Sequence, residues 1–164
     1  MSPLRPDLVD CWIFRDAAGG TEILLIRRAP GRILPGLWQC VSGSVEPGER
    51  IAHAALRELH EETGFDAASI EAFFDLDLVN QFHEPSVDAV LSSAVFAVRV
   101  APIATERLSN EHDGARWLGV DEAWREVVWP GYRTAIERIR DDLSDPSRAA
   151  WFELTLNGER TRGQ

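Results

Sequence analysis

Several features are scarce or missing in this chain of 164 residues. It has only two cysteines, Cys11 and Cys40, which lie in apolar runs and lack the spacing of a zinc site. We therefore expect reduced core thiols in a cytoplasmic protein, rather than a disulfide or metal ligands. No apolar run reaches the roughly 18 residues of a membrane span, and the start MSPLRPDLVD lacks the pattern of a signal peptide. These absences predict an untargeted protein without a membrane partner.

Basic residues are also in deficit, with 17 Lys and Arg against 27 Asp and Glu and a net charge of −10. A nucleic-acid polymer or an anionic membrane is therefore not expected as the main partner, because those need clustered positive charge. A small phosphorylated substrate remains compatible, since a metal ion and a few arginines can supply a local positive field. The length and a hydrophobic content of 45% suit one globular domain.

The most informative segment, GSVEPGERIAHAALRELHEETGF, starts at Gly43. We expect a helix over residues 49–63, because no helix breaker follows Gly48 until Gly64, a residue suited to a left-handed cap. Small and aliphatic residues form one stripe of this helix, suited to packing on a sheet. Three glutamates share another face at spacings i, i+3 and i+4: Glu58, Glu61 and Glu62.

Three carboxylates on one helix face repel one another, and a cation would offset that repulsion. Mg²⁺ takes oxygen ligands and is usually held by one or two carboxylates together with waters and substrate phosphates. The alternative is a solvated acidic face, which is the usual fate of acidic runs. The fixed frame of glycine, glutamate and arginine around these residues favours the metal site. Mg²⁺ is therefore the expected cofactor, with Mn²⁺ as an alternative.

Arg57 lies next to Glu58 in sequence, but their side chains leave the helix about 100° apart. We therefore expect Arg57 to pair with Glu49 near the helix start rather than with Glu58.

The segment resembles the Nudix box at every defining position. The resemblance implies that Glu49 and Arg57 are structural support, bracing the loop against the helix. It also implies that the backbone carbonyl of Gly43 contributes to the metal shell, although a glycine there can also be a plain turn residue. In the same family a further carboxylate often comes from a later loop. The segment LSNEHDGARWL resembles that loop, so Glu111 is assigned as an additional ligand or base, against the alternative of an ordinary polar turn.

The resemblance implies two overlapping sets of residues. The metal ligands are Gly43, Glu58, Glu61, Glu62 and Glu111, and the catalytic candidates are Glu58, Glu61 and Glu111. Which glutamate accepts the proton stays open, because family members differ. His112 is expected to sit in the loop rather than to contact a phosphate.

Substrate-binding residues are expected just before the box. Trp38 can stack on a base or pterin ring while Gln39 reads its edge, although a core tryptophan is the plainer interpretation. Arg27 and Arg28 end a predicted strand, and alternation sends one toward a phosphate and the other toward water. We assign Arg27 to the substrate, with Arg32 in the following loop as a second phosphate ligand.

Apolar, β-rich runs separated by turn signals predict six strands, at 9–14, 22–28, 38–41, 73–82, 89–100 and 115–118. Helices are expected at 121–126 and 130–143 in addition to the box helix. This pattern indicates an α/β or α+β fold with a mixed sheet, and the resemblance implies the α/β/α sandwich of the Nudix fold. Residues 1–143 are expected to form a single Nudix hydrolase domain. Residues 144–164 are a C-terminal extension, expected to be an added edge strand, a dimer contact or an unstructured tail.

The resemblance implies a Mg²⁺-dependent pyrophosphohydrolase acting on a nucleoside diphosphate linked to another group. The flanking motifs WQCVSGSVEPGE and WPGYRTAIERI are similar to those of nucleoside-triphosphate and dihydroneopterin-triphosphate pyrophosphohydrolases. The expected products are a monophosphate and pyrophosphate. The alternatives are a dinucleoside polyphosphate or nucleotide-sugar hydrolase and a non-catalytic nucleotide-binding module. The partner is a small phosphorylated substrate, and the protein is expected to be a monomer or homodimer.

Overall fold

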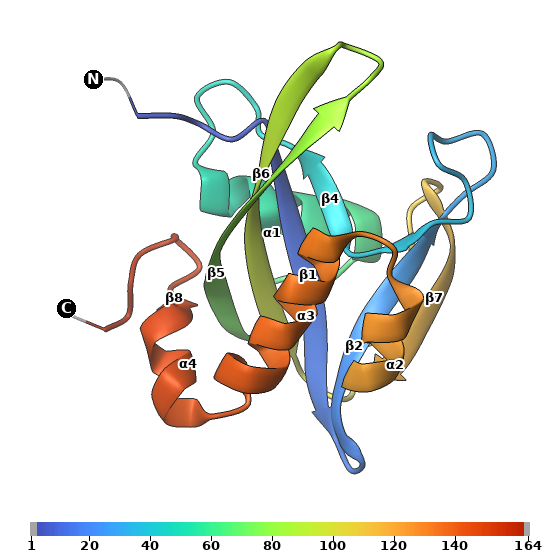
Figure 1. The fold of residues 1–164 in the computed structure, drawn as a ribbon. Helices are drawn as coiled ribbons and strands as arrows, with labels where there is room; N and C mark the ends of the chain where they lie inside the picture. Colours follow the sequence, from blue (N-terminus) through green and yellow to red (C-terminus); the bar gives the residue numbers. More distant parts are fainter. Residues whose placement is uncertain (1–2, 163–164) are drawn as a thin grey trace.

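A mixed β-sheet covered by helices on both faces organises the chain, in a computed structural model that describes residues 3–162 (Figure 1). The strands, in chain order, are β1 Leu8–Ala17, β2 Gly20–Arg28, β3 Trp38–Gln39, β4 Val41–Ser44, β5 Ile70–Glu84, β6 Ala89–Val100, β7 His112–Gly119 and β8 Glu153–Leu154. The helices are α1 Ile51–Thr63, α2 Val120–Glu126, α3 Pro130–Arg138, a π-helical turn η1 Ile139–Leu143 that continues α3, and α4 Pro146–Phe152. None of these helices is long and apolar enough to cross a membrane.

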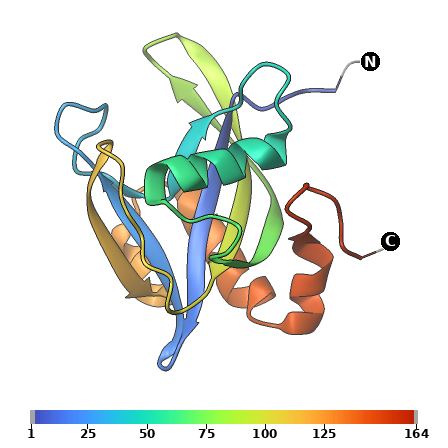
Figure 2. The ribbon, with the colours of Figure 1, turned by 180° about the vertical axis from the view of Figure 1, so that it is seen from behind.

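The sheet runs in the order β3-β2-β1-β6-β5-β8, with β4 paired to β1 and β7 paired to β2. The pair β1–β6 is parallel and the others are antiparallel. Helix α1 covers one face, and α2 and α3 cover the other, which the view from behind makes clear (Figure 2). The predicted α/β/α sandwich with a mixed sheet is therefore confirmed.

Alternating side chains of the strands divide the core into two halves. Trp12 and Leu25 belong to the half beneath α2 and α3, whereas Ile13 and Leu24 belong to the half beneath α1. The one-residue offset follows from the period of two in a strand, which sends neighbouring side chains to opposite faces. The same alternation decides which polar residues at the ends of these strands face α1.

Two boundaries differ from the sequence-based expectation. Helix α1 begins at Ile51, two residues after the predicted start, and ends as predicted at Gly64, whose φ of 75° is left-handed. The predicted strand 38–41 is two short strands, because β3 pairs with β2 while β4 pairs with β1. The chain thus crosses from one neighbour to the next immediately before Gly43.

Part of the C-terminal extension is ordered against the sheet. Helix α4 leads into β8, where Leu154 pairs with Phe73 of β5. Arg160 then forms an ion pair with Asp75, at 2.8 Å between Nη2 and Oδ2. These contacts fix the extension against β5.

Candidate active site

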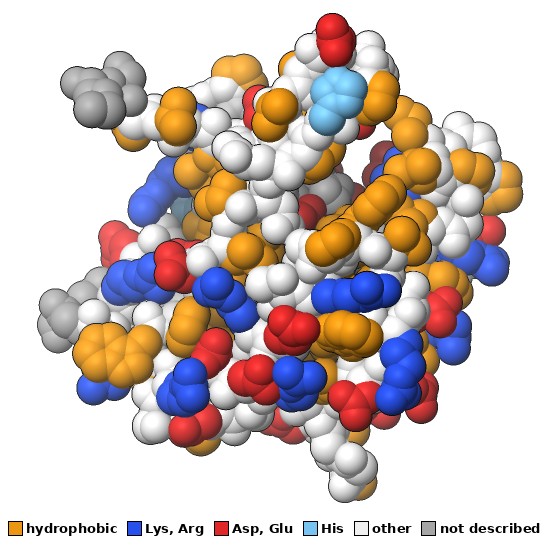
Figure 3. All heavy atoms as spheres, in the orientation of Figure 1, with side chains coloured by type: hydrophobic (Ala, Val, Ile, Leu, Met, Phe, Trp, Pro, Cys, Tyr) orange, Lys and Arg blue, Asp and Glu red, His pale blue; other side chains and the backbone are white. Residues whose placement is uncertain are grey.

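A cleft of about 290 Å³ lies where α1, β4 and the loop before β7 converge. Figure 3 shows the surface hollowed between the β5–β6 hairpin and the loop after β2, with acidic side chains at the bottom of the hollow. Ten residues line the cleft: Arg28, Arg32, Gln39, Ser42, Gly43, Ser44, Glu58, Glu62, Glu111 and His112. Six of them are residues assigned from the sequence to metal or substrate.

Gly43 and Glu58 meet at the floor of this cleft. A Cβ atom added to Gly43 would overlap the carboxyl group of Glu58, far inside the spacing that real Cβ atoms tolerate. Glycine is therefore needed at position 43 for a close approach, because the Glu58 carboxylate fills the space where a side chain would be. The backbone of β4 and the Glu58 carboxylate thus form one compact unit.

Arg57 holds that unit in place through several carboxylates at once. Its Nε and Nη2 donate to the two carboxylate oxygens of Glu49 at 2.8 and 3.0 Å, and Nη2 also donates to the Ser44 carbonyl at 2.9 Å. The guanidinium lowers the pKa of Glu49 to about 2. Nη1 donates to Glu58 Oε1 at 2.7 Å.

The expectation that Arg57 cannot reach Glu58 is therefore wrong. The two Cβ atoms do point in different directions, but the long arginine side chain ends in a planar fork with several donors. Its opposite edges contact different residues, so Glu49 and Glu58 are bridged by one guanidinium.

The three box glutamates occupy different environments. Glu62 is 3% exposed, and the Glu58 side chain is 13% exposed, whereas the Glu61 side chain is 56% exposed. Glu61 contacts Arg57 at 3.4 Å and is not among the residues that line the cleft. Glu58 and Glu62 are thus the box carboxylates that face the cavity.

Burial makes the ionised form of this cluster costly. Burial, together with the neighbouring carboxylates Glu58 and Glu111, raises the pKa of Glu62 to about 9. Burial also raises the pKa of Glu58, although the Arg57 guanidinium opposes that change. One carboxylate oxygen of Glu62, Oε2, is buried without a hydrogen-bond partner in the described part of the chain. A cation beside these oxygens would stabilise the charged form and satisfy the unpaired atom.

The donor set fits a hard divalent cation. Within residues 3–162, no three His, Cys, Asp or Glu side chains form a group that could hold a metal ion by themselves. Mg²⁺ does not require such a group, because it keeps several waters and takes substrate phosphates beside one or two carboxylates. Glu58, Glu62 and Glu111 line one cavity with the Gly43 backbone, which is the kind of open oxygen site that this ion uses.

Glu111 and the arginines form the opposite wall. Arg32 lies 3.4 Å from Glu111, measured between Nη1 and Oε1, and the Ala29 amide donates to the Glu111 carbonyl at 2.9 Å. Arg28 donates to the Ile33 carbonyl, and its Nη1 lies 3.5 Å from the Gln39 side-chain oxygen. This wall sets two guanidinium groups opposite the box carboxylates.

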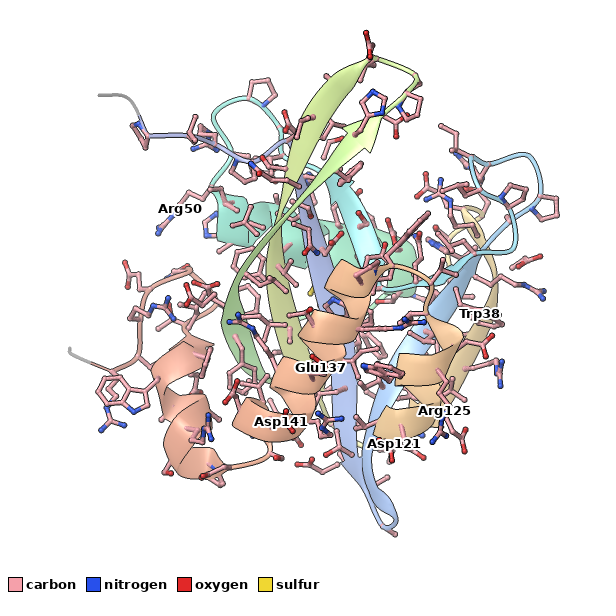
Figure 4. The ribbon with its side chains drawn as sticks, viewed as in Figure 1. Trp38, Arg50, Asp121, Arg125, Glu137 and Asp141 are labelled. Atoms are coloured by element: carbon pink, nitrogen blue, oxygen red, sulfur yellow. The ribbon has the colours of Figure 1, made fainter. Side chains whose placement is uncertain are left out.

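Two residues assigned to the substrate lie elsewhere. Arg27 pairs with Asp113 at 2.8 Å, and the guanidinium groups of Arg27 and Arg116 lie 5.5 and 5.3 Å from the centroid of the Trp38 ring. Figure 4 labels Trp38. Neither Arg27 nor Trp38 lines the cleft. Strand alternation gives the cleft Arg28 instead of Arg27, and Gln39 instead of Trp38.

His112 is the clearest residue that the sequence did not assign to the site. It is the first residue of β7 and only 7% exposed, so the expectation of a loop position is wrong. Its Nε2 lies 3.8 Å from Glu62 Oε2 and 3.4 Å from Gln39 Nε2. Burial lowers the pKa of His112, which favours the neutral ring. The apolar run that predicted this strand begins three residues later, so periodicity gave no sign of it.

A cleft that joins clustered carboxylates to arginines is the arrangement of a metal-assisted phosphate site. In comparison with known proteins, the family model of the NUDIX domain matches residues 4–139. The chain belongs to the NUDIX domain family.

Individual relatives match parts of the chain. A protein from Myxococcus xanthus named octanoyltransferase is 38% identical over 119 residues, which cover 71% of this chain but 32% of that protein. A bis(5'-nucleosyl)-tetraphosphatase from Sus scrofa is 41% identical over 91 residues, covering 52% of this chain and 58% of its own. The chain thus spans less than two thirds of these curated relatives. The structure of the E. coli dihydroneopterin triphosphate pyrophosphohydrolase matches with a TM-score of 0.69 and 26% identity, covering 82% of this chain and 94% of that one.

Proposed function

We propose that this protein is a Mg²⁺-dependent pyrophosphohydrolase that cleaves a phosphoanhydride of a nucleoside-triphosphate-like substrate by attack of water. The products would be a monophosphate and pyrophosphate. The observation that supports the proposal most strongly is the shared cleft of Glu58, Glu62 and Glu111 opposite Arg28 and Arg32. One cavity therefore contains carboxylates that suit a cation and guanidinium groups that suit phosphate oxygens. A cytoplasmic location, with Cys11 and Cys40 buried as free thiols, belongs to the same proposal.

The roles follow from position. When bound, Mg²⁺ or Mn²⁺ would neutralise phosphate oxygens and lower the pKa of a water molecule. Glu58, Glu62 and the Gly43 carbonyl, which line the cleft, would hold the ion, with Glu111 as a ligand or as the acceptor of the proton from the attacking water. Arg28 and Arg32 would bind the phosphate oxygens and stabilise charge that develops on them. Glu61, being largely exposed, is given a supporting role.

A dinucleoside polyphosphate is the second candidate substrate, because the Sus scrofa relative is a tetraphosphatase of that kind with 41% identity over the matched segment. The site residues would be the same, and only the products would differ. A non-catalytic nucleotide-binding module is a weaker alternative, since the buried carboxylates of the cleft are present.

The experiment is hydrolysis with product identification. Purified protein is incubated with nucleoside triphosphates, dihydroneopterin triphosphate, dinucleoside polyphosphates and nucleotide sugars, with Mg²⁺ and with EDTA. Release of monophosphate and pyrophosphate from a triphosphate, abolished by EDTA, supports the proposal. Cleavage confined to dinucleoside polyphosphates would move the assignment to the second candidate. Binding without turnover of any substrate would overturn the enzymatic assignment.

A further inference from the structure

A second cleft, of about 570 Å³, shares no lining residue with the candidate active site. It lies between the N-terminal segment, the first turn of α1, the middle of β5 and the C-terminal extension. Its floor is largely apolar and includes Leu78, Phe96 and Leu154, and its rim carries Arg5, Arg50 and Arg160. The volume is within the range of about 300–1,000 Å³ that is usual for small-molecule sites.

An irregularity in β5 opens one side of this cleft. The pairing with β6 shifts from Asp75–Phe96 to Val79–Ala94, so β5 contains extra residues that bulge out of the ladder. Asp77 in the bulge has a positive φ of 50°. Arg138 holds the bulge by donating from Nη1 to the Leu76 and Asp77 carbonyls at 2.6 and 3.0 Å. The hydrogen bonds from Arg138 therefore hold the bulge, and the opening beside it, in place.

The opposite wall is the C-terminal loop, packed on the first turn of α1. Gly158 has a φ of 79°, and a Cβ placed on it would lie 2.6 Å from the Cβ of Ala52. Leu154 is 8% exposed and joins the core half that contains Ala52 and Phe96. Hydrogen bonds thus fix the wall at β5, and packing fixes the wall at the C-terminal loop.

The three arginines at the rim of the cleft differ in whether they are paired with an acidic residue. Arg160 is paired with Asp75. Arg5 donates to the Glu49 carbonyl, and Arg50 extends from the start of α1 (Figure 4), with Nη2 3.9 Å from the position of a Cβ on Gly158. None of the ion pairs described within residues 3–162 involves Arg5 or Arg50. In a chain of net charge −10, these two guanidinium groups beside an apolar floor are complementary to an anion with an apolar body.

We propose that this cleft binds a small organic anion. Arg5 and Arg50 hold its phosphate or carboxylate group, and its apolar part rests on Leu78 and Phe96. Asp77 also lines the cleft, and its carboxylate would accept a hydrogen bond from a donor on that part.

Titration of ¹⁵N-labelled full-length protein with phenyl phosphate, benzoate and inorganic phosphate tests the proposal by NMR. The amides of Ala52 and Gly158 report on this cleft, and those of Gly43 and Ser44 report on the candidate active site. We expect saturable shifts at Ala52 and Gly158 with one aromatic anion, and weaker binding of inorganic phosphate. The better of the two aromatic probes identifies the anionic group. Shifts confined to Gly43 and Ser44, or equal affinity for inorganic phosphate, would overturn the proposal.

Two arginine variants make the result specific. Arg50→Ala removes an exposed side chain of the cleft and should weaken binding about tenfold or more, as expected for loss of a charge-assisted contact. Arg125→Ala is the matched control, since Arg125 is an exposed arginine on α2, away from Arg50 (Figure 4). Unchanged affinity in Arg50→Ala, or equal losses in both variants, would contradict the proposed site. No step of this test requires hydrolysis, so it stands independently of the proposed function.

Discussion

Replacing Gly43 by alanine should disrupt the unit that Gly43 forms with Glu58. The added methyl group would occupy the space of the Glu58 carboxyl group, so either the carboxylate or the β4 loop must move. Forced overpacking of this kind costs about 1–3 kcal/mol in unfolding free energy. At about 2–4 °C per kcal/mol for a chain of this size, the melting temperature should fall by roughly 2–12 °C. A displacement of about 1 Å at Glu58 should lower kcat about 100-fold.

The assay combines thermal unfolding with the rate of pyrophosphate release. Gly19→Ala is the matched control, because no atom lies within 4 Å of a Cβ at that position. The decisive comparison repeats Gly43→Ala in a Glu58→Ala background, where the obstructing carboxyl group is gone. There the stability loss should vanish, giving a coupling energy of about 1–3 kcal/mol. An equal loss in both backgrounds, or a Gly43→Ala protein as stable and active as Gly19→Ala, would refute the close approach.

Two further predictions concern the brace and the cation. Arg57→Ala leaves Glu49 and Glu58 without their shared partner, so the free energy of unfolding in urea should fall by about 1–3 kcal/mol. Arg57→Lys should recover part of this loss, because lysine keeps the positive charge but lacks the forked donors of the guanidinium group. Wild-type stability in Arg57→Ala would show that the brace is dispensable. Because burial raises the pKa of Glu62 to about 9, this group carries a proton at neutral pH in the absence of a cation. Binding of Mg²⁺ must then release a proton, so calorimetric affinity should increase from pH 6 to pH 9, and a pH-independent affinity would contradict this linkage.

Local sequence patterns predicted the frame of the site. The helix of the box ends at Gly64 as expected. Its end could be predicted because glycine is the usual residue of a left-handed helix cap, which depends only on local sequence. The alternation of apolar residues likewise indicated the strands and the mixed sheet. These features depend on residues that are neighbours in sequence.

The parts that sequence reasoning missed depend on contacts between distant segments. Whether Arg27 or Arg28 faces the cleft is decided by which face of β2 lies beneath α1, and the sequence of β2 alone is apolar on both faces. His112 is buried because β7 starts earlier than its apolar run. The differing exposure of Glu61 and Glu62 follows from how α1 is rotated on the sheet, which equal spacing on a helical wheel does not determine.

The central claim is that carboxylates of this cleft hold a divalent cation, with Glu62 among them and Glu61 outside. Calorimetric titration of Mn²⁺ into wild type, Glu62→Gln and Glu61→Gln tests it most directly, with thermal unfolding to verify that each variant is folded. We expect Glu62→Gln to weaken binding at least about tenfold, as loss of a charged ligand would, and Glu61→Gln to remain close to wild type. Unchanged Mn²⁺ affinity in folded Glu62→Gln would contradict the assignment of the cation to this cleft.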